Sequence, residues 1–354
     1  MESTGLMDLT LTQIEEWVLQ QAMPKFRARQ IAEWIFKNGV ICFDQMSNLP
    51  MDLRKKLQQT AYLENLEEIN KQVSQQTGTT KYLFGLKDSQ AVETVLMEHS
   101  YGHSVCVSTQ VGCKMSCKFC ASTLSGLVRN LTAGEIYAQV MSVQKTQSTR
   151  VSHIVIMGTG EPLDNYDHTI NFMTNINAPY GLDIGYRHIT LSTCGLVPEM
   201  LKLAEKKIPI TLAVSLHAPN DQIRDSIVPI NKRYPLKLLL KACRNYTEMT
   251  GRRVSFEYAL IDNLNDTAEC AKELAGILRN IFCHVNLIPV NPVPERGLQR
   301  TPAQQVQSFK AILVKAGLNV TVRREMGTDI DAACGQLRRR VLDVQKEVSI
   351  GEKN

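Results

Sequence analysis

Short apolar runs of strand type alternate with amphipathic helical runs from about residue 105 to residue 323 of this chain. Thr132 followed by Glu135 is a capping-box helix start, and Gly317 suits a helix end. Regular alternation with short links predicts a parallel sheet, open or closed toward a barrel, with ligands at the carboxyl ends of its strands. Strands are expected at 105–108, 153–157, 187–192, 210–215, 254–260, 285–290 and 320–323, and helices at 132–145, 198–206, 236–248, 268–279 and 302–316.

Before residue 105, apolar residues are spaced in two other patterns. Apolar residues at helical spacing predict helices at 9–21, 27–37 and 52–59, with basic residues left for their outer faces. Those charges fit either a solvated surface or a small module that grips a nucleic-acid backbone. Runs 81–86 and 91–96 then predict a β-hairpin that turns at residues 87–89.

Composition excludes several classes of protein. Hydrophobic residues at 44% and charged residues at 21% are ordinary for a globular protein and exclude a disordered or fibrous chain. The net charge of +5 permits an anionic partner such as RNA without requiring one. The N-terminus has no basic-then-apolar signal pattern, and no apolar run reaches the roughly 18 residues of a transmembrane helix. We therefore expect a cytoplasmic protein without a membrane partner, whose cysteines stay reduced.

Three of the ten cysteines, Cys113, Cys117 and Cys120, lie close together in a loop after an expected strand. They can converge on one metal centre, but a tetrahedral zinc or a cubane cluster would need a fourth ligand, which no neighbouring Cys or His obviously supplies. An open coordination position is typical of a catalytic site. The alternatives are incidental core cysteines or zinc with a remote ligand. With Phe119 before the last cysteine, the motif resembles the signature of the radical S-adenosylmethionine (SAM) superfamily.

That resemblance implies a 4Fe–4S cluster whose free iron binds SAM, within an α/β fold: a radical SAM partial (β/α)6 barrel carrying a small N-terminal helical accessory domain and a β-hairpin extension. The Gly-rich turn after the expected strand 153–157 would let backbone groups approach a ligand closely. For one of the residues implied to bind SAM, His217, the alternative is a histidine that packs in the core. The residues implied to bind SAM are Gly160, Glu161, Ser192, Ser215, Leu216, His217 and Asn291.

Two further cysteines and one carboxylate carry a narrower resemblance. Cys106 precedes the cluster motif, Cys334 lies in the string Asp-Ala-Ala-Cys-Gly-Gln-Leu at 331–337, and Glu93 lies in Val-Glu-Thr upstream. Over almost the whole chain, these strings closely resemble the RlmN/Cfr family of RNA adenosine methyltransferases, and most closely its RlmN branch.

The family resemblance implies methylation at C2 of adenosine 2503 in 23S rRNA and of adenosine 37 in tRNA. Cys334 would take a methyl group from one SAM, and a second SAM, cleaved at the cluster, would supply the activating radical. Glu93 would accept the ring proton, and Cys106 would release the product through a transient disulfide with Cys334. The alternatives are a surface carboxylate for Glu93 and a core thiol for Cys106. Implied partners are a flavodoxin or ferredoxin as electron donor and a thiol reductant, for a monomeric enzyme.

Two other functions compete with this prediction. Within the family, the alternative is Cfr-type methylation at C8 of the same rRNA adenosine, which confers antibiotic resistance; Pro162 after Glu161 favours C2. From another class, a metal-stabilised RNA-binding or redox-sensing protein would retain the cysteines. It would not explain SAM-type motifs at successive strand ends.

The resulting domain organisation has four parts. Residues 1–78 form an N-terminal helical, RNA-binding accessory domain, and 79–98 form the β-hairpin extension. Residues 99–332 form the radical SAM core, and 333–354 form a C-terminal segment that begins with the string around Cys334. Basic residues of the N-terminal helices and of 338–340 suit contacts with RNA phosphates. The other cysteines are expected to pack in the core: Cys42, Cys194, Cys243, Cys270 and Cys283.

Overall fold

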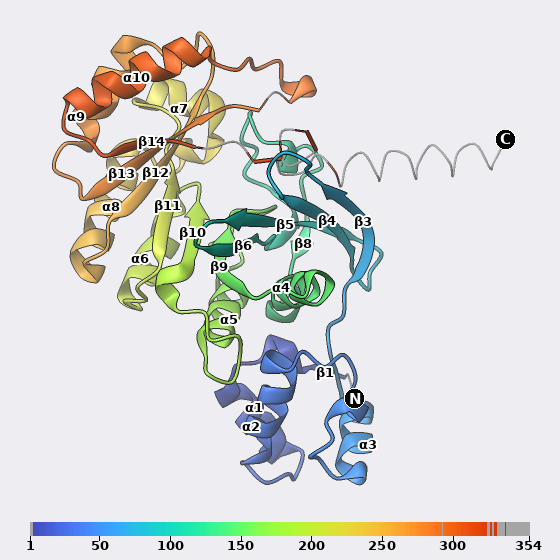
Figure 1. The fold of residues 1–354 in the computed structure, drawn as a ribbon. Helices are drawn as coiled ribbons and strands as arrows, with labels where there is room; N and C mark the ends of the chain where they lie inside the picture. Colours follow the sequence, from blue (N-terminus) through green and yellow to red (C-terminus); the bar gives the residue numbers. More distant parts are fainter. Residues whose placement is uncertain (1–2, 292, 324–325, 328, 331–336, 338–354) are drawn as a thin grey trace.

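The computed structural model describes residues 3–291, 293–323, 326–327, 329–330 and 337. Figure 1 shows a twisted sheet with helices packed around it and a helical N-terminal part at one end. In the described part of the chain, the main sheet has ten strands, in the order β14-β13-β12-β11-β10-β9-β6-β5-β4-β3. The strands of this sheet are β3 (Glu67–Val73), β4 (Thr80–Gly85), β5 (Ala91–His99), β6 (Gly102–Cys106), β9 (Val151–Ile156), β10 (Ile189–Thr193), β11 (Thr211–Ser215), β12 (Val254–Leu260), β13 (Cys283–Pro289) and β14 (Val320–Val322).

Helices connect the parallel strands. β6 and β9 to β14 pair parallel, and a helix lies between each of these strands and the next, which makes six β/α units closed by β14. The predicted fold class, a partial (β/α)6 barrel, is confirmed. The helices are α1 (Leu11–Gln20), α2 (Arg27–Ala32), α3 (Met51–Thr60), α4 (Ala133–Gln147), α5 (Tyr166–Asn177), α6 (Val197–Glu205), α7 (Asp221–Ile227), α8 (Leu236–Thr250), α9 (Ala268–Leu278) and α10 (Ala303–Lys315).

Short elements complete the chain trace. Two small sheets pair β1 (Thr4–Gly5) with β2 (Ala61–Tyr62) and β7 (Gln110–Gly112) with β8 (Leu127–Asn130). The predicted helix 27–37 divides into α2 and a π-helical turn, Glu33–Lys37. The 3-10 turns are Leu6–Asp8, Phe43–Gln45, Ala121–Thr123, Tyr186–His188, Pro229–Lys232 and Pro294–Arg296.

The β-extension, strands β3 to β5, joins the barrel sheet through the antiparallel pair β5 and β6. The predicted hairpin is therefore part of a three-stranded addition. Strand β3 was not predicted from the sequence because it is an edge strand whose residues are almost all exposed, so it lacks the alternation that marks a half-buried strand.

The two faces of the barrel sheet differ in polarity. Val105, Ile154 and Leu191 point toward the helices and are fully buried, which accounts for the apolar strand sequences. Residues between them face the other side, here called the inner face. Cross-strand register places Val95, Cys106 and Val155 in one row of that face.

Local signals explain several helix boundaries. The hydroxyl of Thr132 accepts a hydrogen bond from the Glu135 backbone N–H at 3.1 Å, and the Glu135 carboxylate accepts one from the Thr132 N–H at 2.9 Å. This confirms the predicted capping box. Gly317 has φ +86° just past α10, as expected for a helix stop.

The N-terminal part rests on α4 and α5. The Asp8 carboxylate accepts a hydrogen bond from the Gly134 N–H at 2.8 Å, and the Tyr137 hydroxyl donates to the Phe36 carbonyl at 2.8 Å.

One packing prediction in the N-terminal part is wrong: Cys42 is exposed, because it precedes a 3-10 turn on the surface. The other four cysteines expected to pack are buried. No described helix is long and apolar enough to cross a membrane.

Candidate active site

The three cysteines of the motif lie in a loop between β7 and β8. Cys113 and Cys117 are buried, and Cys120 is half-buried. The Thr123 hydroxyl donates hydrogen bonds to the carbonyls of Cys117 and Cys120, at 3.1 and 2.9 Å, and the Lys118 N–H donates to the Ile227 carbonyl at 2.9 Å. These bonds fix the loop against the end of α7.

The donor set suits a cluster that binds thiolates. Burial raises the pKa of the Cys113 thiol to about 12, and it also raises the pKa values of Cys117 and Cys120. The thiols of Cys120 and Cys113 raise the pKa of Cys117 further. No three His, Cys, Asp or Glu side chains of the described residues already stand in the geometry of a bound metal ion. Cluster assembly would therefore turn the thiols onto iron and remove their protons.

The Gly-rich turn after β9 contains Gly160 and Glu161. Gly160 has φ +114°, and a Cβ atom there would lie 2.7 Å from the Gln110 side chain, so only glycine fits. Glu161 is 3% exposed, and its carboxylate accepts hydrogen bonds from the N–H groups of Cys194 at 2.7 Å and Leu163 at 3.1 Å. Burial raises the pKa of Glu161, while these bonds lower it. The carboxylate thus ties the β9 turn to the β10 turn.

His217 connects the end of β11 to the cluster loop. Its ring meets Phe119 edge-on, with 4.6 Å between centroids, and its Nδ1 accepts a hydrogen bond from the Ala259 N–H at 2.9 Å. Its backbone has φ +57°. Burial lowers the pKa of His217 to about 3, so the ring is neutral at physiological pH. The predicted cluster and SAM motifs therefore meet in space at His217.

The remaining predicted SAM-binding residues lie at the same carboxyl edge. Ser192 and Ser215 are half-buried on β10 and β11, and Leu216 is buried directly after β11. Asn291 is exposed, two residues beyond β13.

Arg224 on α7 is a residue that the sequence analysis missed. Its guanidinium is fully buried and donates to the carbonyls of Cys194 at 2.8 Å, Ser215 at 3.0 Å and Leu216 at 3.0 Å. A fourth bond, to the Asn231 side chain, is 2.8 Å long. One cation thus holds together two loops of the predicted SAM site. An arginine on a short helix gives no sequence signal of this role.

A second group of residues lies on the inner face at the β-extension. Lys81 Nζ lies 3.0 Å from the Glu93 carboxylate, and these side chains are 0% and 4% exposed. Burial raises the pKa of the Cys106 thiol, whereas the nearby charges of Arg323 and Lys81 lower it. The structure thus brings Glu93 and Cys106 together and adds Lys81. A lysine within an apolar strand was the signal for this pair.

Cys334 lies outside the described residues. Two described residues near it in sequence, Asp329 and Leu337, contact the β-extension or the turn after β3. Leu337 packs in a small buried cluster with Leu83 and Ala91, and Leu83 lies directly opposite Glu93 in the sheet. The Asp329 carboxylate accepts a hydrogen bond from the Ser74 hydroxyl at 2.6 Å.

The chain matches two known protein families. Residues 107–274 match the Radical SAM superfamily, and residues 4–63 match the family described as the ribosomal RNA large subunit methyltransferase N-terminal domain. A relative from Desulforamulus reducens, named probable dual-specificity RNA methyltransferase RlmN, is 59% identical over 95% of this chain and 96% of the relative. The chain belongs to the RlmN family. The predicted enzyme class, a radical SAM RNA methyltransferase, is confirmed.

Other members of this family agree over the same length. A relative of the same name from Pelotomaculum thermopropionicum is 56% identical over 94% of this chain and 91% of the relative. Among solved structures, a radical SAM methyltransferase from Sphaerobacter thermophilus is 45% identical, covers 94% of this chain and 98% of its own, and superimposes with a TM-score of 0.88. Membership of the radical SAM superfamily implies a 4Fe–4S cluster and SAM.

Proposed function

We propose that this enzyme methylates C2 of one adenosine in 23S rRNA, adenosine 2503, and of adenosine 37 in tRNA, through a methyl group carried on Cys334. The observation that carries the proposal is the shared wall of Glu93 and Cys106 on the inner face. Leu337, three residues after Cys334, packs on Leu83 directly across the sheet from Glu93. Glu93 as base, Cys106 as thiol and the residue that follows Cys334 by three positions therefore all lie on the inner face of the β-extension and β6.

These groups suit methylation of an aromatic ring carbon such as C2. Adenine C2 is an electron-poor carbon and does not attack a SAM methyl group as a nitrogen or oxygen nucleophile would. When bound, the cluster held by Cys113, Cys117 and Cys120, together with two SAM molecules per turnover, supplies the methyl group and the radical that activates it. A thiolate such as Cys334 accepts a methyl group readily.

Product release is assigned to the wall residues. Once the transferred carbon is bonded to C2, the radical adduct must lose one electron and the proton of the ring carbon. Glu93 accepts the proton, the electron would pass to the bound cluster, and Lys81 holds the carboxylate in place. The Cys106 thiolate attacks the Cys334 sulfur, forming an S–S bond. The bond from that sulfur to the transferred carbon breaks, its electron pair stays on carbon, and the carbon takes a proton to become the methyl group. A thiol reductant then reopens the disulfide, and a flavodoxin or ferredoxin supplies electrons.

The SAM site is assigned to the strand ends described above. Gly160 and Glu161 approach the SAM ammonium group, and Glu161 also orients the Cys194 turn. Ser192, Ser215, Leu216, His217 and Asn291 line the rest. Arg224 fixes the position of two of these loops without itself facing the ligand.

Nucleoside analysis tests the proposed regiochemistry. Ribosomal RNA and tRNA lacking the modification are incubated with reconstituted enzyme, SAM and reductant, and their nucleosides are separated by mass spectrometry. We expect 2-methyladenosine in both RNAs. Finding 8-methyladenosine would instead establish the Cfr-type reaction, and unmodified RNA from an enzyme that cleaves SAM would refute the proposed substrate.

A further inference from the structure

Basic residues line the amino-terminal edge of the parallel sheet, opposite the cluster loop. Four strands that are adjacent in the sheet, β9 to β12, are each preceded by a short loop with at least one exposed cation. Neighbouring strands are about 5 Å apart, so the cations follow one another in a row. The exposed members are Arg150, Arg187, Lys206, Lys207 and Arg253.

None of these cations forms an ion pair within the described part of the chain. Eight ion pairs are present in the described part of the chain, and none involves a member of this row. A sixth basic residue, Arg252, is half-buried and donates to the Ile210 carbonyl and the Thr211 hydroxyl at 3.4 Å, which places it at the start of β11. Exposed acidic residues also occur nearby, at Glu98, Asp183 and Glu205, and Asp183 lines one cavity with Arg150, but the five cations outnumber them.

A line of aromatic rings lies on the same edge. His99 stacks on Tyr101, with 4.7 Å between centroids and 7° between planes. Tyr101 meets His153 edge-on at 5.0 Å, and His153 meets His188 at 4.6 Å with a hydrogen bond of 2.9 Å between their ring nitrogens. Tyr101 is 63% exposed, so its ring is open to a ligand.

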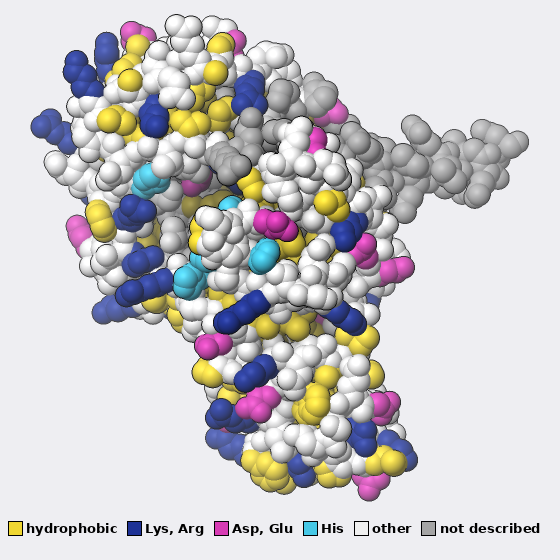
Figure 2. Space-filling view, in the orientation of Figure 1, with side chains coloured by type: hydrophobic (Ala, Val, Ile, Leu, Met, Phe, Trp, Pro, Cys, Tyr) yellow, Lys and Arg dark blue, Asp and Glu magenta, His cyan; other side chains and the backbone are white. Residues whose placement is uncertain are grey.

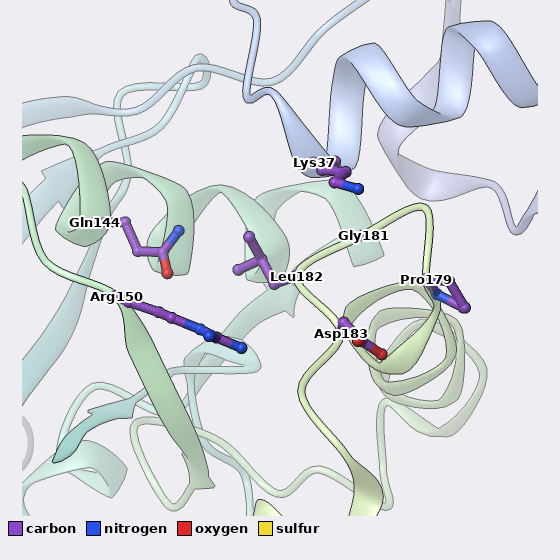
Figure 3. A pocket seen from close by; sticks show the side chains of 7 residues that line it. All are labelled: Lys37, Gln144, Arg150, Pro179, Gly181, Leu182 and Asp183. Carbon is purple, nitrogen blue, oxygen red and sulfur yellow. The ribbon is translucent and has the colours of Figure 1, made fainter.

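The two features form one surface. Figure 2 shows histidine (cyan) and Lys or Arg (dark blue) side chains, with some acidic ones (magenta) among them, on one face of the core above the N-terminal part. Figure 3 shows how the surface continues: Arg150 lines a cavity of about 360 Å³ with Gln144 and Asp183, and Lys37 reaches it from the N-terminal part. The amino-edge surface is defined here by the exposed cations of the four loops together with Tyr101, His99, His153 and His188.

We propose that the amino-edge surface is an RNA contact surface that takes backbone phosphates on its cations and an unpaired base against Tyr101. A row of cations on adjacent loops suits the repeated negative charges of a nucleic-acid backbone. Exposed aromatic rings beside them are what unstacked bases bind. The combination of cations with an exposed ring favours RNA as the occupant. The inference rests on the proposed RNA substrate.

The position of the surface suits a substrate larger than the active site. Apart from β14, the barrel strands are five to seven residues long, so the amino edge lies about 17–23 Å from the carboxyl edge. A folded RNA covers that distance with several nucleotides. The amino-edge surface would then hold the body of the RNA while its target base enters at the other edge.

Binding of labelled RNA to the reconstituted full-length enzyme tests the proposal. Fluorescence anisotropy is measured with a tRNA transcript and a 23S rRNA fragment over a range of salt concentrations. The double variant R187E/R253E should weaken binding at least about tenfold and lower the salt slope by about two. K272E/K315E, which reverses two exposed lysines on α9 and α10, is the matched control and should bind within about twofold of the parent. Equal affinities of the two double variants would overturn the proposal.

Two further measurements test whether a base stacks on Tyr101 and whether the occupant is RNA or the electron-donor protein. Tyr101→Ala should weaken RNA binding at least about fivefold, whereas Tyr101→Phe should bind as the parent does; equal loss in both variants would contradict stacking.

SAM cleavage driven by dithionite and by flavodoxin should be the same in R187E/R253E and the parent. If only the flavodoxin-driven rate fell and RNA affinity did not change, the surface would serve the electron donor and the proposal would be wrong. Because anisotropy needs no turnover, failure of the proposed methylation would be visible separately, as absence of 2-methyladenosine.

Discussion

Lys81 and Glu93 form an ion pair inside the wall that carries the proposed release chemistry, with 3.0 Å between Nζ and the carboxylate oxygen. Lys81 lies on β4 opposite Val95, and Val95 lies opposite Cys106 on β6. Lys81 therefore lies near the thiol of Cys106 as well as beside the proposed base, Glu93. A buried carboxylate without a counter-charge is costly, so Lys81 allows a charged base to stand in an apolar wall.

Replacing Lys81 by Met should abolish turnover and destabilise the fold. Removing one partner of a buried ion pair leaves the other charge uncompensated, which costs about 3–5 kcal/mol. Urea unfolding of the metal-free protein measures the loss of stability, and single-turnover methylation of tRNA measures the loss of activity.

The double variant Lys81→Met/Glu93→Met separates the two effects. With both charges gone, the free energy of unfolding should return to within about 1–2 kcal/mol of the parent, while methylation stays absent. A Lys81→Met enzyme that methylates RNA at the parental rate would show that the ion pair is structural alone.

Arg224 should control SAM affinity without touching SAM. Arg224→Met leaves the carbonyls of Cys194, Ser215 and Leu216 without their donor, which costs on the order of 3 kcal/mol and loosens two loops of the SAM site. We expect SAM to bind at least about tenfold more weakly in equilibrium dialysis. Arg233→Met, at an exposed position just before α8, is the control and should bind SAM normally. Normal SAM binding by Arg224→Met would exclude the positioning role.

The sequence predicted what depends on local pattern. Alternating strands and helices, the capping box at Thr132 and the cysteine motif all carry their signal within a few residues. Lys81 has a local signal, a lysine within an apolar strand, but its pairing with Glu93 and the Arg224 bonds have none, because each depends on strands or loops brought together only by the fold. Cys42 shows the opposite failure: a cysteine is usually buried, but its place before a surface turn overrides that tendency.

His217 predicts a specific loss of stability in acid. Its pKa is about 3 in the folded protein and about 6.5 in an unfolded chain, so only the unfolded state gains a proton as the pH falls between those values. Stability from this group is complete above about pH 6.5 and decreases as the pH falls toward 3, by about 1.4 kcal/mol between pH 7.5 and 5.5.

His217→Asn isolates that contribution, because the amide oxygen can accept the Ala259 hydrogen bond but does not titrate. Urea unfolding of both metal-free proteins at the two pH values should give a pH dependence that is smaller in the variant by about 1.4 kcal/mol. An identical pH dependence would mean that His217 is protonated in the folded state as readily as in the unfolded chain.

Variants of Cys334 and Cys106 should stop the reaction at different points. Cys334→Ser should give no methylated RNA, since a hydroxyl does not accept and release the methyl group as sulfur does. Cys106→Ala should still form the bond between Cys334 and the RNA but fail to break it, so a covalent protein–RNA adduct should accumulate on a denaturing gel. Cys243→Ala, which removes a buried thiol on α8, is the control and should leave no adduct. Free RNA alone from Cys106→Ala would contradict the release role of Cys106, and product from Cys334→Ser would contradict the methyl-carrying role of Cys334.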